Sequence, residues 1–230
     1  MLTHLSPIHI EKYIQEVENV PSEKQIRIGV LALQGAFIEH CHSLYRVGAK
    51  PVEVRTAEDL DGLHGICLPG GESTVMAKLL VQNNMLDKLA CLINKGLPVF
   101  ATCAGLILLS KEIIGFENQP RLNCLDIAVN RNAFGRQIDS FVEEMEMLAP
   151  KHSYLNEEHK KVVFPAVFIR APQVASVGDN VEILSKREER ILAVQQKSIV
   201  AVAFHPELTE NMLFHTWLYE EAKHYKEIIK

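Results

Sequence analysis

Short apolar runs alternate with amphipathic stretches along the first half of this 230-residue chain. Apolar runs are typical of buried strands, whereas apolar residues three or four positions apart are typical of helices. The pattern predicts strands over 26–33, 51–55, 66–68 and 99–102, and helices over 37–47, 74–80 and 86–95. Regular alternation of this kind predicts a parallel sheet covered by helices.

The second half of the chain has a different pattern. Apolar segments occur at 127–129, 162–170, 181–186, 190–196 and 199–204, before a closing helix predicted over 212–226. The short spacing between the last three segments predicts antiparallel pairing. We therefore expect an α/β fold whose central sheet is mostly parallel and carries an antiparallel extension. This assigns residues 26–230 to one domain.

Residues 1–25 precede the alternating pattern and form an N-terminal extension. Their apolar residues have a partly helical spacing and include no long apolar run. A secretory signal or a membrane span is therefore not expected. Two alternatives stay open: a short amphipathic helix that docks on the body or on a partner, or a loose tail.

Cys103 stands between the apolar run 97–102 and the helix-like run 104–109. A strand that turns into a helix through small residues presents the side chain at the turn, as in a nucleophile elbow. The helix N-terminus also favours a thiolate. A reactive cysteine is therefore the leading interpretation. The alternative is a buried core cysteine, because a free cysteine commonly behaves as a small hydrophobe.

The predicted strand 199–204 ends in His205-Pro206-Glu207. Side chains two positions apart on an extended segment point to the same side, so Glu207 can orient the ring of His205. A thiol, an imidazole and a carboxylate are the groups of a triad for acyl transfer. Alone, this tripeptide could equally be a solvated turn. Together with Cys103 it predicts a catalytic triad.

A Gly-Gly loop follows the predicted strand at 66–68 and precedes a helical pattern. Acyl transfer requires N–H donors for the developing oxyanion, and glycine lets the backbone approach a substrate closely. The N–H groups of Gly71 and Ala104 are the candidate donors. The alternative is an ordinary strand-to-helix loop in which Ser73 or Thr74 caps the helix.

Composition narrows the functional classes. The formal net charge of −5 gives no basic surface for nucleic acid. The five cysteines form no Cys-x-x-Cys pair and no closely spaced Cys/His set, so neither a metal site nor a disulfide framework is expected. An odd number of cysteines, one of them required as a free thiol, suits a reducing cytoplasm.

Six segments, in chain order, carry a family resemblance: GVLALQG at 29–35, LPGGEST at 68–74, TCAGLI at 102–107, RNAFGRQ at 131–137, VFIRAP at 167–172 and FHPELT at 204–209. They resemble class I, or triad, glutamine amidotransferases, and more closely the glutaminase subunits of pyridoxal 5′-phosphate synthases. The match runs from about residue 26 to about residue 225. The fold it implies is a three-layer, flavodoxin-like α/β fold.

The resemblance also implies an activity and a set of site residues. Members hydrolyse the side-chain amide of L-glutamine through a cysteinyl thioester, releasing glutamate and ammonia. Carried over by position, Cys103 is the nucleophile, His205 the general base and acid, and Glu207 the residue that orients His205. The residues implied in glutamine binding are Gly71, Glu72, Ser73, Arg131, Ile169 and Arg170.

A partner is expected because nothing in the chain resembles a synthetase domain or a phosphate-binding loop that could use the ammonia. The resemblance implies a barrel-fold synthase subunit in a large hetero-oligomer that builds pyridoxal 5′-phosphate, for which Gln34 is the candidate interface residue. Pyridoxal phosphate is then a product of the complex, and no cofactor is expected. Two alternatives remain: a free-standing cysteine amide hydrolase and a non-catalytic regulatory subunit.

The chain also departs from the family pattern. Ala101 stands where relatives often have glycine, two residues before Cys103, and we expect only a minor adjustment there. The charged stretch 148–164 is longer than in most relatives and is predicted to be a surface insertion.

Overall fold

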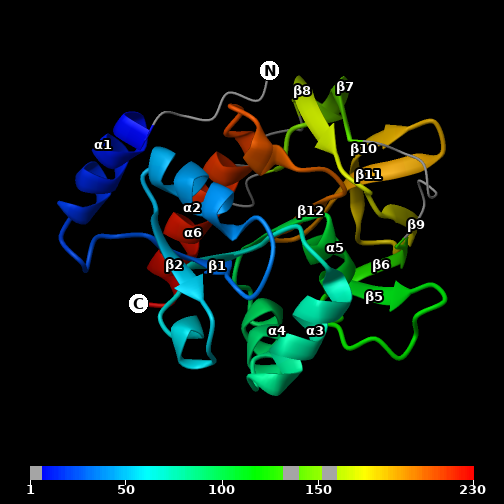
Figure 1. Cartoon of the computed structure of the whole chain (residues 1–230), viewed down its shortest axis with the longest axis horizontal. Helices are drawn as coiled ribbons and strands as arrows, with labels where there is room; N and C mark the ends of the chain where they lie inside the picture. Colours follow the sequence, from blue (N-terminus) through cyan, green and yellow to red (C-terminus); the bar gives the residue numbers. More distant parts are fainter. Residues whose placement is uncertain (1–6, 132–139, 152–159) are drawn as a thin grey trace.

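The computed structural model of the chain describes residues 7–131, 140–151 and 160–230 (Figure 1). These residues form a ten-stranded central sheet with helices on both faces, and a separate two-stranded sheet. Strands of the central sheet follow the order β2-β1-β3-β4-β12-β11-β9-β6-β5, with β10 paired to β11.

The first half of the chain builds the parallel part of the sheet, as predicted. Its strands are β1 (Arg27–Leu31), β2 (Lys50–Val54), β3 (Gly65–Leu68) and β4 (Val99–Thr102), and β12 (Ile199–Val202) adds to them in parallel beside β4. The helices of this half are α2 (Phe37–Arg46), α3 (Ser73–Gln82), α4 (Leu86–Asn94) and α5 (Ala104–Leu109). In such a sheet the carboxyl ends of neighbouring strands meet at one edge, where a site can form.

The predicted antiparallel extension is also confirmed. Strand β11 (Arg190–Gln196) pairs antiparallel with β12, with β10 (Glu182–Arg187) and with β9 (Gln173–Val177). Strand β6 (Leu125–Asn130) pairs antiparallel with β9 and parallel with β5 (Ser110–Ile113). The short, polar strands β5 and β9 were not predicted.

The second sheet consists of β7 (Phe141–Leu148) and β8 (Lys161–Phe168). Its antiparallel register pairs Leu148 with Lys161. The two ends of the stretch 148–164 therefore belong to paired strands, and the expected surface insertion stays a prediction. Residues 152–159 of that stretch lie outside the described residues.

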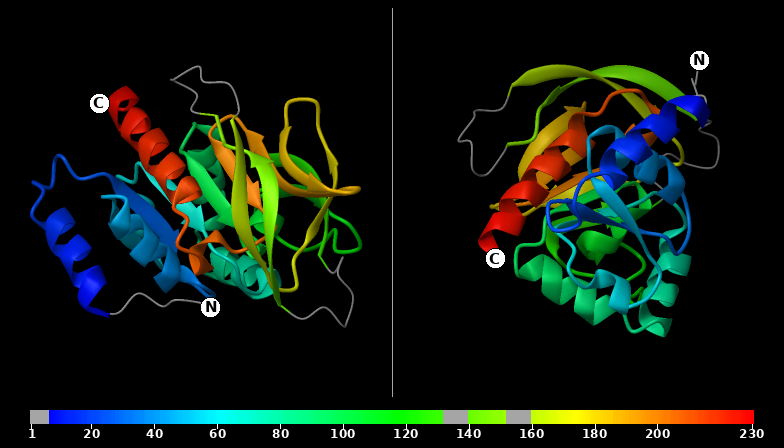
Figure 2. Two further views of the ribbon diagram at one scale, coloured as in Figure 1. Left: turned by 90° about the horizontal axis from the view of Figure 1, so that it is seen from above. Right: turned by 90° about the vertical axis from the view of Figure 1, so that its left-hand side faces the viewer.

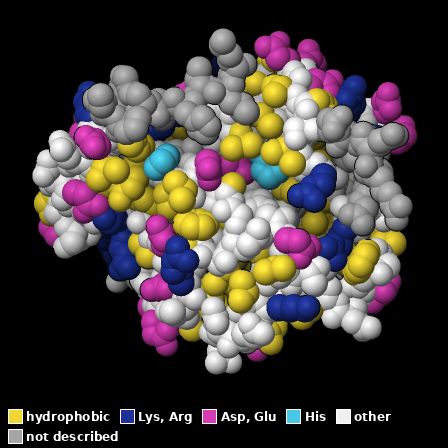
Figure 3. All heavy atoms as spheres, viewed as in Figure 1, with side chains coloured by type: hydrophobic (Ala, Val, Ile, Leu, Met, Phe, Trp, Pro, Cys, Tyr) yellow, Lys and Arg dark blue, Asp and Glu magenta, His cyan; other side chains and the backbone are white. Residues whose placement is uncertain are grey.

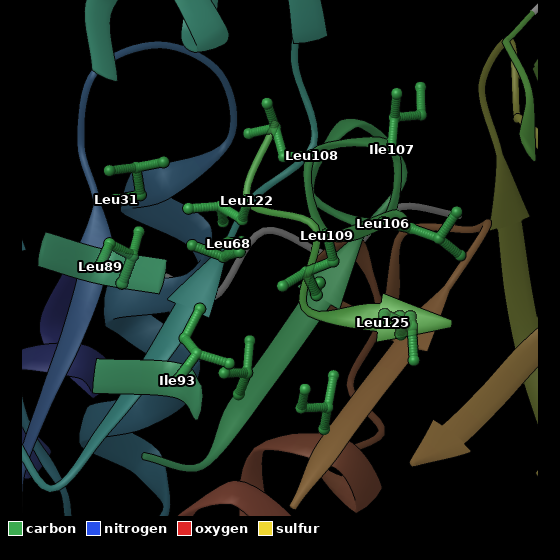
Figure 4. Close-up of a cluster of buried hydrophobic side chains, with 14 of the residues drawn as sticks. Leu31, Leu68, Leu89, Ile93, Leu106, Ile107, Leu108, Leu109, Leu122 and Leu125 are labelled. Carbon is green, nitrogen blue, oxygen red and sulfur yellow. The ribbon is translucent and has the colours of Figure 1, made fainter. Parts of the chain in front are cut away.

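Helices lie on both sides of the central sheet (Figures 1 and 2), and a buried hydrophobic cluster fills the space on each side. Helices α3, α4 and α5 cover an aliphatic cluster that includes Leu68, Leu89 and Leu108 (Figure 4). Helix α2, helix α6 (Leu213–Ile228) and the β7–β8 sheet cover a second cluster rich in aromatic rings, with Phe100 and Phe214 stacked 5.1 Å apart. Side-chain alternation along each strand divides its residues between the two clusters.

The N-terminal extension contains helix α1 (Pro7–Glu18), which packs against α2 (Figure 2). Val17 is buried, and Glu18 forms an ion pair with Lys50 at the start of β2. Lys226 of α6 donates hydrogen bonds to the backbone oxygens of Glu23 and Gln25, at 2.7 Å each. Of the two alternatives for this segment, the structure has the docked helix.

Two surface features bear on the classes of partner. Acidic and basic side chains are interspersed over the face seen in Figure 3 rather than gathered by sign. Within the described ranges, none of the helices has the length and apolar character needed to cross a membrane.

Candidate active site

Cys103 lies directly after β4 in a strained backbone conformation, with φ +47° and ψ −100°. Residues other than glycine rarely adopt positive φ, and such a residue costs on the order of 1–3 kcal/mol. Two contacts hold the turn. The Cys103 N–H donates to the oxygen of Val202 at 2.9 Å, and a Cβ at Gly105 would lie 2.2 Å from the oxygen of Leu68. The three strand ends of β3, β4 and β12 therefore fix where the thiol points.

His205 and Glu207 lie just beyond β12 and are both buried. The backbone N–H of His205 donates to the oxygen of Val167 in β8 at 2.8 Å, which ties the segment to the second sheet. His205 Nδ1 lies 2.8 Å from Glu207 Oε1. Because an ionised carboxylate can only accept, this contact places a proton on Nδ1 and directs Nε2 away from Glu207.

Burial alone lowers the pKa of His205, but the interaction with the Cys103 side chain, the hydrogen bond to Glu207 and the charge of these two groups outweigh it and raise that pKa to about 10. The ring therefore carries a proton at neutral pH beside the sulfur atom. A thiol paired with an imidazolium is the arrangement that activates cysteine nucleophiles.

Gly70, the first residue of the Gly-Gly loop, packs directly against the side chains of His205 and Cys103. A Cβ at position 70 would lie 2.4 Å from His205 Cε1 and 3.5 Å from Cys103 Cβ. Sequence reasoning singled out Gly71 and missed Gly70, although the Gly-Gly pair was the available signal. The close approach explains why the first position of the pair must lack a side chain.

The loop over 34–36 fixes the Gly-Gly loop from outside. Gln34 Oε1 accepts a hydrogen bond from the Glu72 N–H at 2.6 Å, and the Gly70 oxygen accepts one from the Ala36 N–H at 3.2 Å. Gln34, expected at a partner interface, thus bonds within its own chain to the loop where the oxyanion donor Gly71 is expected. The interface role stays a prediction.

Glu72 caps helix α3, because its Oε2 accepts from the Val75 N–H at 2.9 Å. The alternative in which Ser73 or Thr74 caps this helix is therefore wrong. Partial burial alone raises the pKa of Glu72, but backbone hydrogen bonds from Val75 and Thr74 and the charge of Arg131 outweigh it and lower that pKa.

Arg131 lies against this cap at the end of the described part of the loop. Its Nη2 is 2.9 Å from Glu72 Oε1, its Nη1 donates to Gln119 Oε1 at 2.7 Å, and its guanidinium carbon lies 4.6 Å from the centre of the Phe116 ring. Gln119 was not predicted, and no signal in the sequence identified it. Arg131 and Glu72 together place one guanidinium and one carboxylate side by side.

The remaining predicted residues lie around the thiol. Cys103 Sγ is 4.0 Å from the oxygen of Ile169, and Arg170 follows in an exposed position with φ +45°. Ser73 and Ala104 are buried, and Ser73 Oγ has no hydrogen-bond partner in the structure. Among the described residues, no group of three or more histidine, cysteine or carboxylate side chains is arranged so that it could hold a metal ion.

Comparison with known proteins identifies the family. A family model described as the SNO glutamine amidotransferase family matches residues 30–224. The chain belongs to this family. The match includes Cys103, His205 and Glu207 and begins after helix α1.

Curated relatives agree with the family match. The chain is 46% identical over 192 residues to "Pyridoxal 5′-phosphate synthase subunit PdxT" of Moorella thermoacetica, which covers 84% of this chain and 97% of the relative. It is also 46% identical over 203 residues to the protein of the same name from Dehalococcoides mccartyi, covering 87% and 100%.

A solved structure titled "Crystal structure of glutamine amidotransferase" is 42% identical to the chain, with a TM-score of 0.75, and the match covers 85% of this chain and 98% of that one. The expected class I glutamine amidotransferase fold is thereby confirmed.

Proposed function

We propose that this chain is the glutaminase subunit of a pyridoxal 5′-phosphate synthase, which hydrolyses L-glutamine and passes the ammonia to a synthase subunit. One observation carries the proposal. In a member of a glutamine amidotransferase family, a cysteine on a strained turn interacts through its side chain with a histidine, and an oxygen of a buried carboxylate lies 2.8 Å from that histidine. The activity resides in residues 26–230, and residues 1–25 are an extension.

The triad performs acyl transfer in two halves. The sulfur of Cys103 attacks the side-chain amide carbon of glutamine, and the proton held by His205 moves to the departing nitrogen, which leaves as ammonia. A water molecule then attacks the thioester, His205 takes its proton, and the sulfur leaves to give glutamate. Glu207 keeps the ring of His205 in the required tautomer and orientation throughout.

The tetrahedral intermediates of both halves carry an oxyanion. We assign the N–H groups of Gly71 and Ala104 as its donors, because Ala104 follows the nucleophile and Gly71 belongs to the loop packed on His205 and Cys103. Donors of this kind are worth on the order of 2.7–4 kcal/mol each in barrier height.

The glutamine backbone requires a partner for each of its two charges. Arg131 can bind the α-carboxylate through its planar guanidinium, and Glu72 can accept from the ammonium group. In the free protein these two side chains neutralise each other at 2.9 Å. Ser73, Ile169 and Arg170 complete the binding residues.

The product ammonia requires a second site. The relatives are named as subunits of pyridoxal 5′-phosphate synthase, so the partner is a synthase subunit, here assigned a barrel fold within a large hetero-oligomer. Gln34 lies next to the Gly-Gly loop and is the assigned contact to that partner. The chain requires neither a metal nor a cofactor, and the complex works in the cytoplasm.

Glutamate release from glutamine tests the proposal, with the purified chain alone and with a purified synthase subunit. We expect strong stimulation by the synthase and a loss of at least about 10³-fold in Cys103→Ala. Cys91→Ala removes an exposed thiol elsewhere and serves as the matched control.

Two other results would contradict the proposal. Turnover that ignores the synthase would identify a free-standing hydrolase, and no turnover in either mixture would identify a regulatory subunit.

A further inference from the structure

A group of buried polar side chains lies behind Glu207, on the side away from His205. His40 of α2 is its centre, and its Nε2 lies 3.3 Å from Thr102 Oγ1 and 3.6 Å from Glu207 Oε2. The opposite ring nitrogen, Nδ1, lies 3.0 Å from His215 Nε2 and 3.1 Å from Cys67 Sγ. The group thus connects α2, α6, β3 and β4 with the carboxylate of the proposed triad.

Two atoms of this group have unsatisfied hydrogen-bonding capacity. Glu207 Oε1 accepts from His205, but Glu207 Oε2 is buried without a hydrogen bond of normal geometry, and so is His215 Nδ1. A buried carboxylate oxygen without a donor is costly, and such an atom in a native structure requires an explanation. His40 Nε2 faces this oxygen at 3.6 Å, so a proton on this nitrogen supplies the donor that the oxygen otherwise lacks.

The positions of the protons follow from the network. A buried acceptor without a partner is tolerated better than a buried N–H without one, so the isolated Nδ1 of His215 carries no proton. His215 then donates from Nε2 to His40 Nδ1, and the proton of His40 lies on Nε2, directed at Thr102 and Glu207. With this assignment both oxygens of Glu207 face a histidine N–H.

We propose that His40 is a positioning residue for the triad: it holds Oε2 of Glu207, so that Oε1 stays directed at His205, and His215 fixes the tautomer of His40 that can do so. The inference rests on the proposed glutaminase function. His40 touches neither the substrate nor the Cys103 sulfur in this account and acts only through Glu207.

The charges around His40 suit this role. Burial, with the charges of His215 and His205, holds the pKa of His40 well below its usual range. Burial and the charge of Arg46 lower the pKa of His215 to about 3. Burial also raises the pKa of Cys67, so this thiol is neutral. The positive charge beside Glu207 is therefore carried by His205, where the chemistry requires it.

The competing account gives these histidines a purely structural role, since the ring of His40 also makes an edge contact with Phe100 at 5.9 Å. Two substitutions of His40 distinguish the positioning role from the purely structural role. His40→Leu keeps the volume and removes the donor, whereas His40→Gln keeps an amide N–H near the place of Nε2. His215→Leu removes the group that fixes the tautomer.

The first measurement is the pH dependence of Cys103 alkylation by iodoacetamide, in a Cys91→Ser background with the modified peptide quantified by mass spectrometry. We expect His40→Leu to shift this profile to higher pH, because a loosely held Glu207 stabilises the His205 imidazolium less. His40→Gln should restore most of the profile, and His215→Leu should lie between them.

The second measurement is glutamine hydrolysis in the presence of the synthase subunit. We expect His40→Leu to lower kcat by about 10–100-fold, the loss typical when a residue that orients a metal ligand is replaced, with KM changed by less than about twofold. His64→Gln removes a different buried histidine and should change neither measurement.

Thermal unfolding of each variant keeps the test decisive. The proposal is overturned if folded His40→Leu has the wild-type alkylation profile and kcat, or if His40→Gln is as impaired as His40→Leu. If His40→Leu does not fold, folded His215→Leu decides: a wild-type alkylation profile and kcat in that variant overturn the proposal. Alkylation needs no glutamine, so a wild-type chain without glutaminase activity would contradict the proposed function and leave this inference to be judged separately.

Discussion

The two faces of the central sheet are covered by different types of side chain. The face under α3, α4 and α5 is filled with leucine, isoleucine and small apolar residues, with Leu68, Leu89 and Leu108 fully buried. The face under α2 and α6 combines aromatic rings with the buried histidines His40 and His215. Close packing alone is enough on the first face, whereas the second also holds polar groups in fixed positions.

Single strands serve both faces. In β3, Leu68 packs in the aliphatic cluster while its neighbour Cys67 contacts His40, and in β4 the same alternation separates Ala101 from Phe100. The proposed triad lies where these strands end. The comparison therefore predicts that damage to the aliphatic face lowers stability, and that damage near the strand ends lowers activity.

The largest effect on stability is expected from Leu89→Ala. Leu89 is fully buried in the aliphatic cluster (Figure 4), on helix α4, which carries none of the proposed site residues. Truncation of such a leucine costs about 2–5 kcal/mol. Urea unfolding should show this loss, with kcat of the folded enzyme unchanged. Val75→Ala, at a position 43% exposed on α3, should change stability by less than about 0.5 kcal/mol. A large fall in kcat for Leu89→Ala would remove the distinction between the two faces.

Gly70→Ala should lower activity and leave stability nearly unchanged, the opposite of Leu89→Ala. The new Cβ would lie 2.4 Å from His205 Cε1, so the ring must shift away from Cys103. A displacement of about 1 Å in a catalytic group costs about 100-fold in rate. Steady-state glutaminase assays should show this loss in kcat, while circular dichroism and the unfolding midpoint stay near those of the wild type. Full activity of this variant would mean that Gly70 does not pack on a working His205.

Much of this architecture is visible in the sequence, for identifiable reasons. The central parallel strands β3, β4 and β12 are short, largely apolar and buried at every position, and Cys103, His205 and Glu207 follow strand ends, so local patterns are enough to find them. Strands β5 and β9 carry polar residues and exist because distant partners pair with them.

The site contacts that the sequence did not predict also depend on partners elsewhere in the chain. His40 lies far along the chain from Glu207, and Gln119 lies twelve residues from Arg131; only the folded structure brings each pair together. Local periodicity identifies residues that act where a strand ends. It does not identify residues that act through a partner elsewhere in the chain.

A smaller effect is expected at the elbow itself. Cys103 has φ +47°, a conformation that glycine adopts without strain and alanine does not. Cys103→Gly should therefore be more stable than Cys103→Ala by about 1 kcal/mol, although both are inactive. Chemical unfolding of the two variants measures the difference. Equal stabilities would mean that the elbow relaxes once the thiol is removed.

The smallest effect at neutral pH is expected from a buried histidine that lies away from the proposed site. His64 precedes β3, at the end opposite to Gly70, and its Nδ1 accepts from the Arg27 N–H at 2.9 Å. Burial, with the charges of Lys226, Arg27 and Lys230, lowers the pKa of His64 to about 4. An unfolded chain binds a proton at this residue near pH 6.5, so between these two values the unfolded state holds more protons and stability rises with pH.

This contribution is complete above about pH 6.5 and is lost as the pH falls through about 4. In His64→Gln the amide oxygen can accept from Arg27 in place of the ring, so stability at pH 7 should change by less than about 0.5 kcal/mol. The slope of unfolding free energy against pH should be shallower by about one proton between pH 4 and 6.5. Urea unfolding across that range measures the slope, and an unchanged slope would mean that His64 titrates alike in both states. Glutaminase activity should not change, which would distinguish this histidine from His40 and place the coupling to catalysis in the polar face beneath α2 and α6.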